Sequence, residues 1–189
     1  MRPTLYLHGF LSHPNSAKPQ LLRAAHEKVG KPFIAPELYM SPREVRDHLI
    51  ELVVSLEEAP DLIGSSLGGY YAVWLKEHAE AHRAVLLNPA LGNWGKVEFK
   101  SGWHPVSGID KQMFVCESFM DELEEGLVRG LARPQDYLSL ISLQDEVLDA
   151  GVTLEFLKGT NLIKIPTGDH RISNFKPHVS EIMDFLLNS

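Results

Sequence analysis

The sequence is poor in cysteine and in long hydrophobic runs. Its single cysteine, Cys116, excludes an internal disulfide and a metal site built from several thiolates. Nothing near Cys116 suggests an activated thiolate, so we expect a small buried hydrophobic side chain. No apolar run approaches the roughly 20 residues of a membrane span, and the segment from Arg2 to Leu7 shows no apolar core of a secretory signal. These absences predict a cytoplasmic protein without membrane association.

Excess positive charge is also lacking. The chain has 18 lysines and arginines against 25 aspartates and glutamates, and its formal net charge is -7. Because the two signs are mixed along the chain, no basic patch is available to neutralise a phosphate backbone, which argues against nucleic acid as a partner. Internal repeats, linkers and low-complexity tracts are absent as well. A length of 189 residues, 44% of them hydrophobic, predicts one domain spanning residues 1–189.

Short apolar runs alternate with amphipathic stretches along most of the chain. This alternation is typical of βαβ units and predicts a three-layer α/β/α sandwich around about six mostly parallel strands. We expect the strands at residues 4–7, 32–35, 60–64, 84–87, 138–142 and 162–165, and the helices at 16–29, 42–56, 67–80, 122–131, 147–157 and 179–187. In such sheets ligands bind beyond the carboxyl ends of the strands.

Residues 91–134 interrupt this rhythm. Glycines alternate there with aromatic residues, and a clear helical pattern returns only near residue 122. A long irregular insertion over the carboxyl edge of a sheet is often a lid or a substrate pocket. We therefore expect a lid-like insertion in which Trp94, Phe99 and Trp103 form an apolar pocket. The alternative is a surface excursion that these aromatic side chains merely anchor.

The Gly64-Ser65-Ser66-Leu67-Gly68 segment lies between a predicted strand and a predicted helix. A nucleophile elbow needs a serine at such a turn, with small residues two positions before and two positions after it. Ser66 meets this requirement because Gly64 and Gly68 flank it, whereas the bulky Ile63 and Leu67 flank Ser65. We predict Ser66 as the nucleophile. The alternative is an ordinary turn or helix cap, because glycine and serine are common in both.

A serine nucleophile requires a histidine as base and a carboxylate that orients the histidine. His170 lies in the loop directly after the last predicted strand, and Asp145 lies just beyond the strand before it. The chain order Ser66, Asp145, His170 is that of the α/β-hydrolases. We therefore predict a catalytic triad of these three residues, which needs no metal ion or organic cofactor.

Other side chains could compete for the two partner roles. Glu146, Asp149 and Asp169 are alternative acids, and His178 at the start of the last helix is an alternative base. Two histidines four residues apart can also form a metal pair on a helix. His78 and His82 have this spacing. No third ligand is in view for them, so we expect a solvated helix face instead of a metal site.

An oxyanion hole requires two backbone N–H donors. One is expected from Leu67, the residue after the nucleophile, because it begins a helix whose dipole favours an anion. The other is expected from the His8-Gly9-Phe10 loop after the first strand, where Gly9 permits close backbone approach and the Phe10 N–H donates. His8 is then a hydrogen-bonding residue that organises the loop.

The segments around these residues resemble the YqiA-like (UPF0227) family of small bacterial esterases. The similarity extends from end to end of the chain, and its segments are 6–10, 12–18, 63–72, 74–75, 88–90, 145–149 and 168–170. The resemblance implies a compact α/β-hydrolase fold without the first two of the usual eight strands. It also implies an esterase or thioesterase that acts on acyl esters. Two departures from the family pattern, Gln144 before the acid and Asp169 before the histidine, remove no predicted catalytic group.

Together these features predict a serine hydrolase that cleaves small-molecule acyl esters or thioesters through an acyl-enzyme. One alternative uses the same triad to transfer the acyl group to another acceptor or to peroxide. A second alternative is a hydrolase-fold protein that binds a ligand without turning it over.

Overall fold

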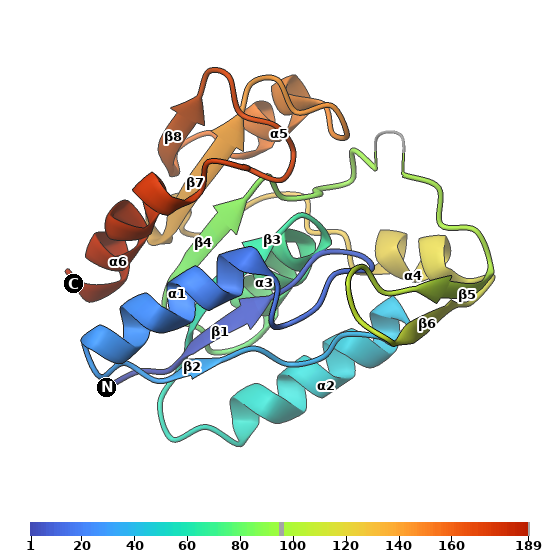
Figure 1. The fold of residues 1–189 in the computed structure, drawn as a ribbon, viewed down its shortest axis with the longest axis horizontal. Helices are drawn as coiled ribbons and strands as arrows, with labels where there is room; N and C mark the ends of the chain where they lie inside the picture. Colours follow the sequence, from blue (N-terminus) through green and yellow to red (C-terminus); the bar gives the residue numbers. More distant parts are fainter. Residues whose placement is uncertain (95–96, 189) are drawn as a thin grey trace.

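The computed structural model describes residues 1–94 and 97–188, and its centre is a six-stranded parallel sheet (Figure 1). The strand order is β2-β1-β3-β4-β7-β8, which confirms the predicted parallel sheet. Its strands are β1 (Thr4–Leu7), β2 (Phe33–Ile34), β3 (Asp61–Ser65), β4 (Ala84–Leu87), β7 (Tyr137–Ser142) and β8 (Asn161–Ile165).

Strand β3 lies inside the sheet, between β1 and β4. Its register pairs Gly64 with Leu7 on one side and Ser65 with Leu87 on the other. Strands β1, β3, β4 and β7 are buried along their whole length, as expected for parallel strands covered on both faces. The loops that follow β1, β3 and β4 therefore begin side by side at the carboxyl edge of the sheet.

Helices cover both faces of the sheet (Figure 1), and each face has its own hydrophobic core. Leu22 of α1 and Ile182 of α6 pack with Ile63 on one face, whereas Leu49 of α2 and Leu75 of α3 pack on the other. The predicted three-layer fold is therefore confirmed. The helices are α1 (Ala17–Lys28), α2 (Pro42–Val54), α3 (Leu67–His78), α4 (Phe119–Glu125), α5 (Ala150–Phe156) and α6 (Val179–Leu187), with 3-10 turns at Pro134–Asp136 and Lys176–His178.

Helices α4 and α5 differ most from the sequence prediction, whereas the ends of α1, α2 and α3 lie within two residues of it. Helix α5 begins at Ala150 instead of residue 147, because Asp149 caps it by accepting hydrogen bonds from the N–H groups of its first turn. Helix α4 covers Phe119–Glu125 instead of residues 122–131. It ends at Gly126, where an added Cβ would overlap the Tyr70 hydroxyl and the Arg46 guanidinium, so the chain packs closely against α3 and α2 at this point.

The insertion at residues 91–134 is more regular than the sequence indicates. It contains an antiparallel hairpin of β5 (Gly102–Pro105) and β6 (Gln112–Val115) as well as α4. In β6 the alternation extends over four residues, with Met113 and Val115 buried and Gln112 and Phe114 exposed. The predicted insertion also includes Gly95 and Lys96, which lie outside the described residues.

Within the described part of the chain, no helix is long and apolar enough to cross a lipid bilayer.

Candidate active site

Ser66 occupies a strained turn between β3 and α3. Its backbone angles are φ 54° and ψ -119°, a combination that costs of order 1–3 kcal/mol for a non-glycine residue. The turn is tight because a Cβ at Gly64 would overlap the Gly68 carbonyl, and a Cβ at Gly68 would overlap the carbonyl of Leu7 on β1. Ser66 precedes α3, yet its side chain makes no capping hydrogen bond. The hydroxyl is therefore available for another partner.

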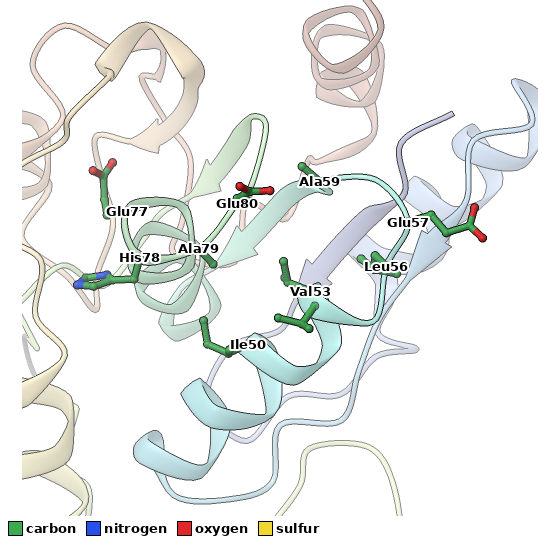
Figure 2. Close-up of a pocket in the computed structure, with 10 residues that line it drawn as sticks. Ile50, Val53, Leu56, Glu57, Ala59, Glu77, His78, Ala79 and Glu80 are labelled. Atoms are coloured by element: carbon green, nitrogen blue, oxygen red, sulfur yellow. The ribbon is translucent and has the colours of Figure 1, made fainter.

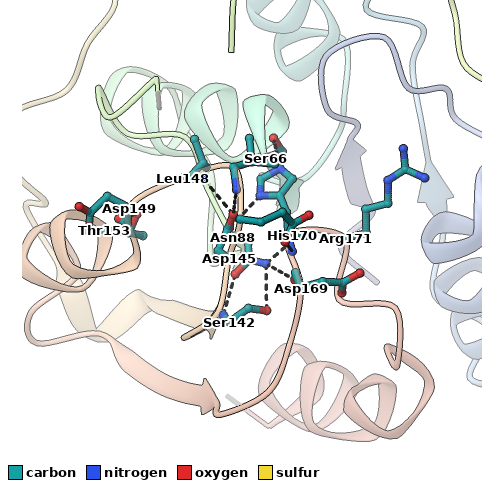
Figure 3. A network of polar contacts seen from close by, with 12 residues as sticks. Ser66, Asn88, Ser142, Asp145, Leu148, Asp149, Thr153, Asp169, His170 and Arg171 are labelled. Atoms are coloured by element: carbon teal, nitrogen blue, oxygen red, sulfur yellow. Dashed lines mark hydrogen bonds and ion pairs between the residues drawn. The ribbon is translucent and has the colours of Figure 1, made fainter. Parts of the chain in front are cut away.

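That partner is His170, and Asp145 lies behind it (Figure 3). The distance from Ser66 Oγ to His170 Nε2 is 2.9 Å, and that from His170 Nδ1 to Asp145 Oδ2 is 2.7 Å. A carboxylate only accepts hydrogen bonds, so the histidine proton is on Nδ1, and Nε2 accepts from the serine hydroxyl. The structure thus brings the three predicted residues into one continuous hydrogen-bonded chain.

The Asp145 carboxylate is fixed from two sides. Its Oδ1 atom accepts hydrogen bonds from the N–H groups of Val147 and Leu148, both at 2.8 Å, and the side chain is only 4% exposed. Burial raises the pKa of Asp145, but the hydrogen bonds from His170, Leu148 and Val147 outweigh it and hold the pKa below its usual value. The carboxylate is therefore ionised and correctly oriented to stabilise an imidazolium.

The competing acids have other partners. Glu146 accepts from the backbone N–H of His170 at 2.9 Å and so contacts the loop rather than the ring. Asp149 caps α5, one position before its first residue and not a turn inside it. Asp169 accepts from the N–H and the hydroxyl of Ser173.

The other histidines that the sequence singles out also lie elsewhere in the hydrogen-bond network. The Nδ1 atom of His178 is 2.8 Å from the carboxylate of Glu181. His78 stacks on Trp74, while His82 Nδ1 lies 2.9 Å from Asp61 Oδ1. Because His78 and His82 have different partners, the structure does not pair them as ligands.

The loop after β1 approaches Ser66 closely. A Cβ added to Gly9 would lie 3.2 Å from Ser66 Cβ, a tight contact that the absence of a side chain avoids. Within the described residues, the N–H groups of Phe10 and Leu67 make no backbone or side-chain hydrogen bond, which leaves both free for a ligand. These are the two donors that the sequence predicts for an oxyanion hole.

Buried His8 sets the orientation of this loop. Its Nε2 accepts from the Leu38 N–H at 3.2 Å, so its Nδ1 carries the proton and donates to the Gly9 carbonyl at 3.0 Å. In a trans peptide the C=O and N–H point in opposite directions. Holding the Gly9 carbonyl toward His8 therefore directs the Phe10 N–H away from it.

This burial of a neutral histidine predicts that stability depends on pH. Desolvation lowers the pKa of His8 below the value of about 6.5 in the unfolded chain. As pH falls below about 6.5 the unfolded state binds a proton that the folded state does not, so the free energy of unfolding decreases, by at most about 1.4 kcal/mol per pH unit. Urea unfolding of the His8→Gln variant should show a shallower decrease between pH 6.5 and 5 than the wild type.

His26 contributes to the same decrease, because burial also lowers its pKa, so the His8→Gln variant should keep part of the slope. The matched control is His78→Gln, since His78 is exposed. A His8→Gln slope equal to that of the wild type would contradict the explanation.

The predicted pocket residues separate into two groups. Trp94 is 9% exposed and packs edge to face against Phe99, and Phe99 packs in the same way against Phe10, with ring centroids 5.0 Å apart. Trp103 is 67% exposed and pairs with Phe114 on the hairpin. The structure therefore places Phe99 against the oxyanion loop but does not bring Trp103 to the same cluster.

Asn88 is a site residue to which the sequence reasoning gave no role. It follows β4 directly, is buried, and has φ 42°. Its side-chain amide hydrogen-bonds with Ser142 at the end of β7 and with the carbonyls of Asp169 and His170 (Figure 3). The available signal was an asparagine directly after a buried strand, since asparagine tolerates positive φ and can bond to the backbone.

A separate groove of about 620 Å³ lies between the C-terminal ends of α2 and α3 (Figure 2). Its lining is mixed: apolar side chains such as Ile50 and Val53 lie beside the carboxylates of Glu57, Glu77 and Glu80. These helix ends lead into the starts of β3 and β4, so the groove lies at the edge of the sheet opposite Ser66. It contains none of the three hydrogen-bonded residues of the candidate site.

The parallel sheet with helices on both faces, together with the strained serine after β3, defines the chain as an α/β-hydrolase fold, which solved members of that superfamily share. The family model described as "Uncharacterised protein family (UPF0227)" matches residues 3–187. The chain therefore belongs to the UPF0227 family, as its sequence motifs predict.

Named relatives agree with this placement. A UPF0227 protein of Enterobacter sp. (strain 638) is 27% identical over 195 residues, covering 96% of this chain and 97% of its own. A monoacylglycerol lipase of Paleococcus ferrophilus has a TM-score of 0.71 at 14% identity, covering 98% of this chain and 95% of its own. An esterase domain of a Rhodothermus marinus protein has a TM-score of 0.69 at 18% identity, with coverage of 98% and 86%. At these identities the two solved structures show the shared fold.

Proposed function

We propose that this protein is a serine hydrolase that cleaves carboxylic esters or thioesters. The observation that carries the proposal is the continuous chain from Ser66 through His170 to Asp145, with distances of 2.9 and 2.7 Å. The position of Ser66 in a strained elbow supports the same conclusion, because strain at a functional turn exposes a nucleophile.

The proposed reaction proceeds through an acyl-enzyme. Ser66 Oγ attacks the substrate carbonyl carbon while His170 Nε2 takes the hydroxyl proton, and the carbonyl oxygen becomes an oxyanion held by the N–H groups of Phe10 and Leu67. His170 then protonates the leaving alcohol or thiol as the bond to carbon breaks. Water attacks the acyl-enzyme by the same route, releasing the carboxylic acid and restoring Ser66. Asp145 stabilises the imidazolium in both steps.

The names of two structural relatives support an ester as the substrate. One is a monoacylglycerol lipase and the other an esterase domain, and both names denote carboxylic ester hydrolysis. We propose an ester of an acyl group for this chain too, with the half-buried Phe99 beside Phe10 on the side where an apolar group would lie.

Labelling with a fluorophosphonate tests the proposal. The probe should modify the wild-type protein at Ser66, as located by peptide mass spectrometry, and hydrolysis of short-chain and longer-chain esters and thioesters should disappear in step with the modification. The Ser66→Ala variant should remain unlabelled. The neighbouring Ser65→Ala variant is the matched control and should be labelled normally, because Ser65 is buried at the end of β3.

Two results would overturn the assignment. A protein that binds esters while Ser66 stays unmodified would be a ligand-binding protein with this fold. A protein that forms mainly new esters or peracids in the presence of competing alcohols or peroxide would be an acyltransferase or perhydrolase.

A further inference from the structure

The side chain of Asn88 connects three strand ends of the sheet. Its Oδ1 atom accepts from the Ser142 N–H at 2.8 Å, which fixes the amide relative to β7. Its Nδ2 group lies 2.9 Å from the His170 carbonyl, 3.1 Å from the Asp169 carbonyl and 3.1 Å from Ser142 Oγ. Since the residue is 2% exposed, water does not compete for these bonds.

The backbone around Asn88 also holds the elbow. The Ser66 N–H donates to the Leu87 carbonyl at 3.0 Å, and the Ala90 N–H donates to the Ser66 carbonyl at 3.0 Å. Pro89 packs closely against α3, because a Cβ added to Gly69 would lie 2.5 Å from the Cβ of Pro89. Leu87 and Ala90 therefore bond to the serine backbone, and the side chain of Asn88 between them bonds to the histidine loop.

Other hydrogen bonds also hold the histidine loop, including the 2.7 Å bond between His170 Nδ1 and Asp145 Oδ2. Glu146 accepts from the His170 N–H at an exposed position. Lys18 of α1 donates to the Arg171 carbonyl at 2.6 Å, also at an exposed position. Among the described residues, Asn88 donates to two carbonyls of this loop from the segment 87–90, which also bonds to the Ser66 backbone. Asn88 therefore links the backbone of the histidine loop to the backbone of the elbow.

We propose that Asn88 is a positioning residue that sets the distance between His170 Nε2 and Ser66 Oγ. The inference rests on the proposed hydrolase function. Its physical basis is that the amide donates to the carbonyl of His170 itself, so loss of the donor frees the histidine backbone. A misplacement of about 1 Å in such a site can lower the rate about 10²-fold.

Two Asn88 variants test this role. Asn88→Asp keeps the shape and the acceptor for the Ser142 N–H but replaces the Nδ2 donor by an oxygen that repels both loop carbonyls. Asn88→Gly removes the side chain, and glycine accepts the φ of 42° without strain. For a short-chain ester, we expect kcat to fall about 10²-fold in both variants while KM stays near its wild-type value.

A matched control exists at the opposite edge of the sheet. Asn161, at the start of β8, also donates its Nδ2 to two backbone carbonyls, those of Gln135 at 2.9 Å and Tyr137 at 3.0 Å. Asn161→Asp removes an equivalent pair of bonds far from Ser66. We expect it to lower the melting temperature but to leave kcat unchanged.

A spectroscopic measurement reports the histidine independently of turnover. The low-field ¹H NMR resonance of the His170 Nδ1 proton should shift or broaden in both Asn88 variants and stay unchanged in Asn161→Asp. The role would be overturned by an Asn88→Gly variant with wild-type kcat and resonance, by equal kcat losses in the Asn88 and Asn161 variants, or by Asn88 variants that unfold at the assay temperature.

The same experiment separates this inference from the proposed function. If the fluorophosphonate does not label wild-type Ser66, the function fails before any Asn88 variant is compared. If Ser66 is labelled in the wild type and at the same rate in Asn88→Gly, the function stands and the positioning role of Asn88 is wrong.

Discussion

Asp145→Asn is expected to lower kcat for ester hydrolysis about 10⁴-fold. In the wild type, Asp145 Oδ1 accepts two N–H groups and Oδ2 accepts from His170. The asparagine oxygen would stay with the two N–H donors, so its NH₂ group would face His170 Nδ1. The imidazole would then carry its proton on Nε2, where it cannot accept the proton of Ser66. Steady-state kinetics on a short-chain ester measure the loss.

The matched control for this substitution is Asp149→Asn. Asp149 lies four residues after Asp145 and caps α5, and asparagine is an equally good helix cap, so both kcat and stability should stay close to the wild type. Wild-type kcat in Asp145→Asn, or an equal loss in Asp149→Asn, would show that Asp145 is not the acid of the site.

Gly68→Ala is expected to destabilise the fold by more than about 4 kcal/mol, or to prevent folding. The added methyl group would overlap the Leu7 carbonyl oxygen, and the contact is with backbone, which no change of rotamer relieves. The helix would have to move away from β1, and the loop that carries Phe10 follows β1 directly. Denaturant unfolding, with circular dichroism as the signal, measures the change.

Gly130→Ala provides the control for the loss of a glycine. Gly130 is exposed, and a Cβ there would meet no atom within 4 Å in the described structure. The expected change lies within about 0.5 kcal/mol of zero. A Gly68→Ala protein as stable as Gly130→Ala would show that α3 and β1 can separate at little cost, contrary to the tight elbow.

The sequence predicted the sheet well because its strands are short, uniformly apolar and separated by helices. Parallel strands that are buried on both faces need apolar residues at every position, and β4 has this pattern from Ala84 to Leu87. The same regularity indicates which residues lie at the carboxyl edge. It could not predict β6, since a four-residue strand with one exposed face gives too short a pattern to distinguish from a loop.

The site shows the same division between local and long-range information. The position of Ser66 in a tight turn was predictable because the turn depends on local sequence, namely glycines two positions before and two positions after the serine. The contacts of Asn88 depend on Ser142 and His170, which are 54 and 82 residues away, and no local pattern encodes them. Trp103 illustrates the reverse case, because an aromatic side chain in an insertion can face solvent as well as a pocket.

The position of β8 has a consequence for the kind of stability that the site requires. This strand is at the end of the sheet and is the only one of the six with several exposed residues, while the loop after it carries His170. Edge elements with few buried contacts open locally at a lower free energy than the whole protein unfolds. Local opening of this edge is therefore a route by which His170 can separate from Ser66 while the core stays folded.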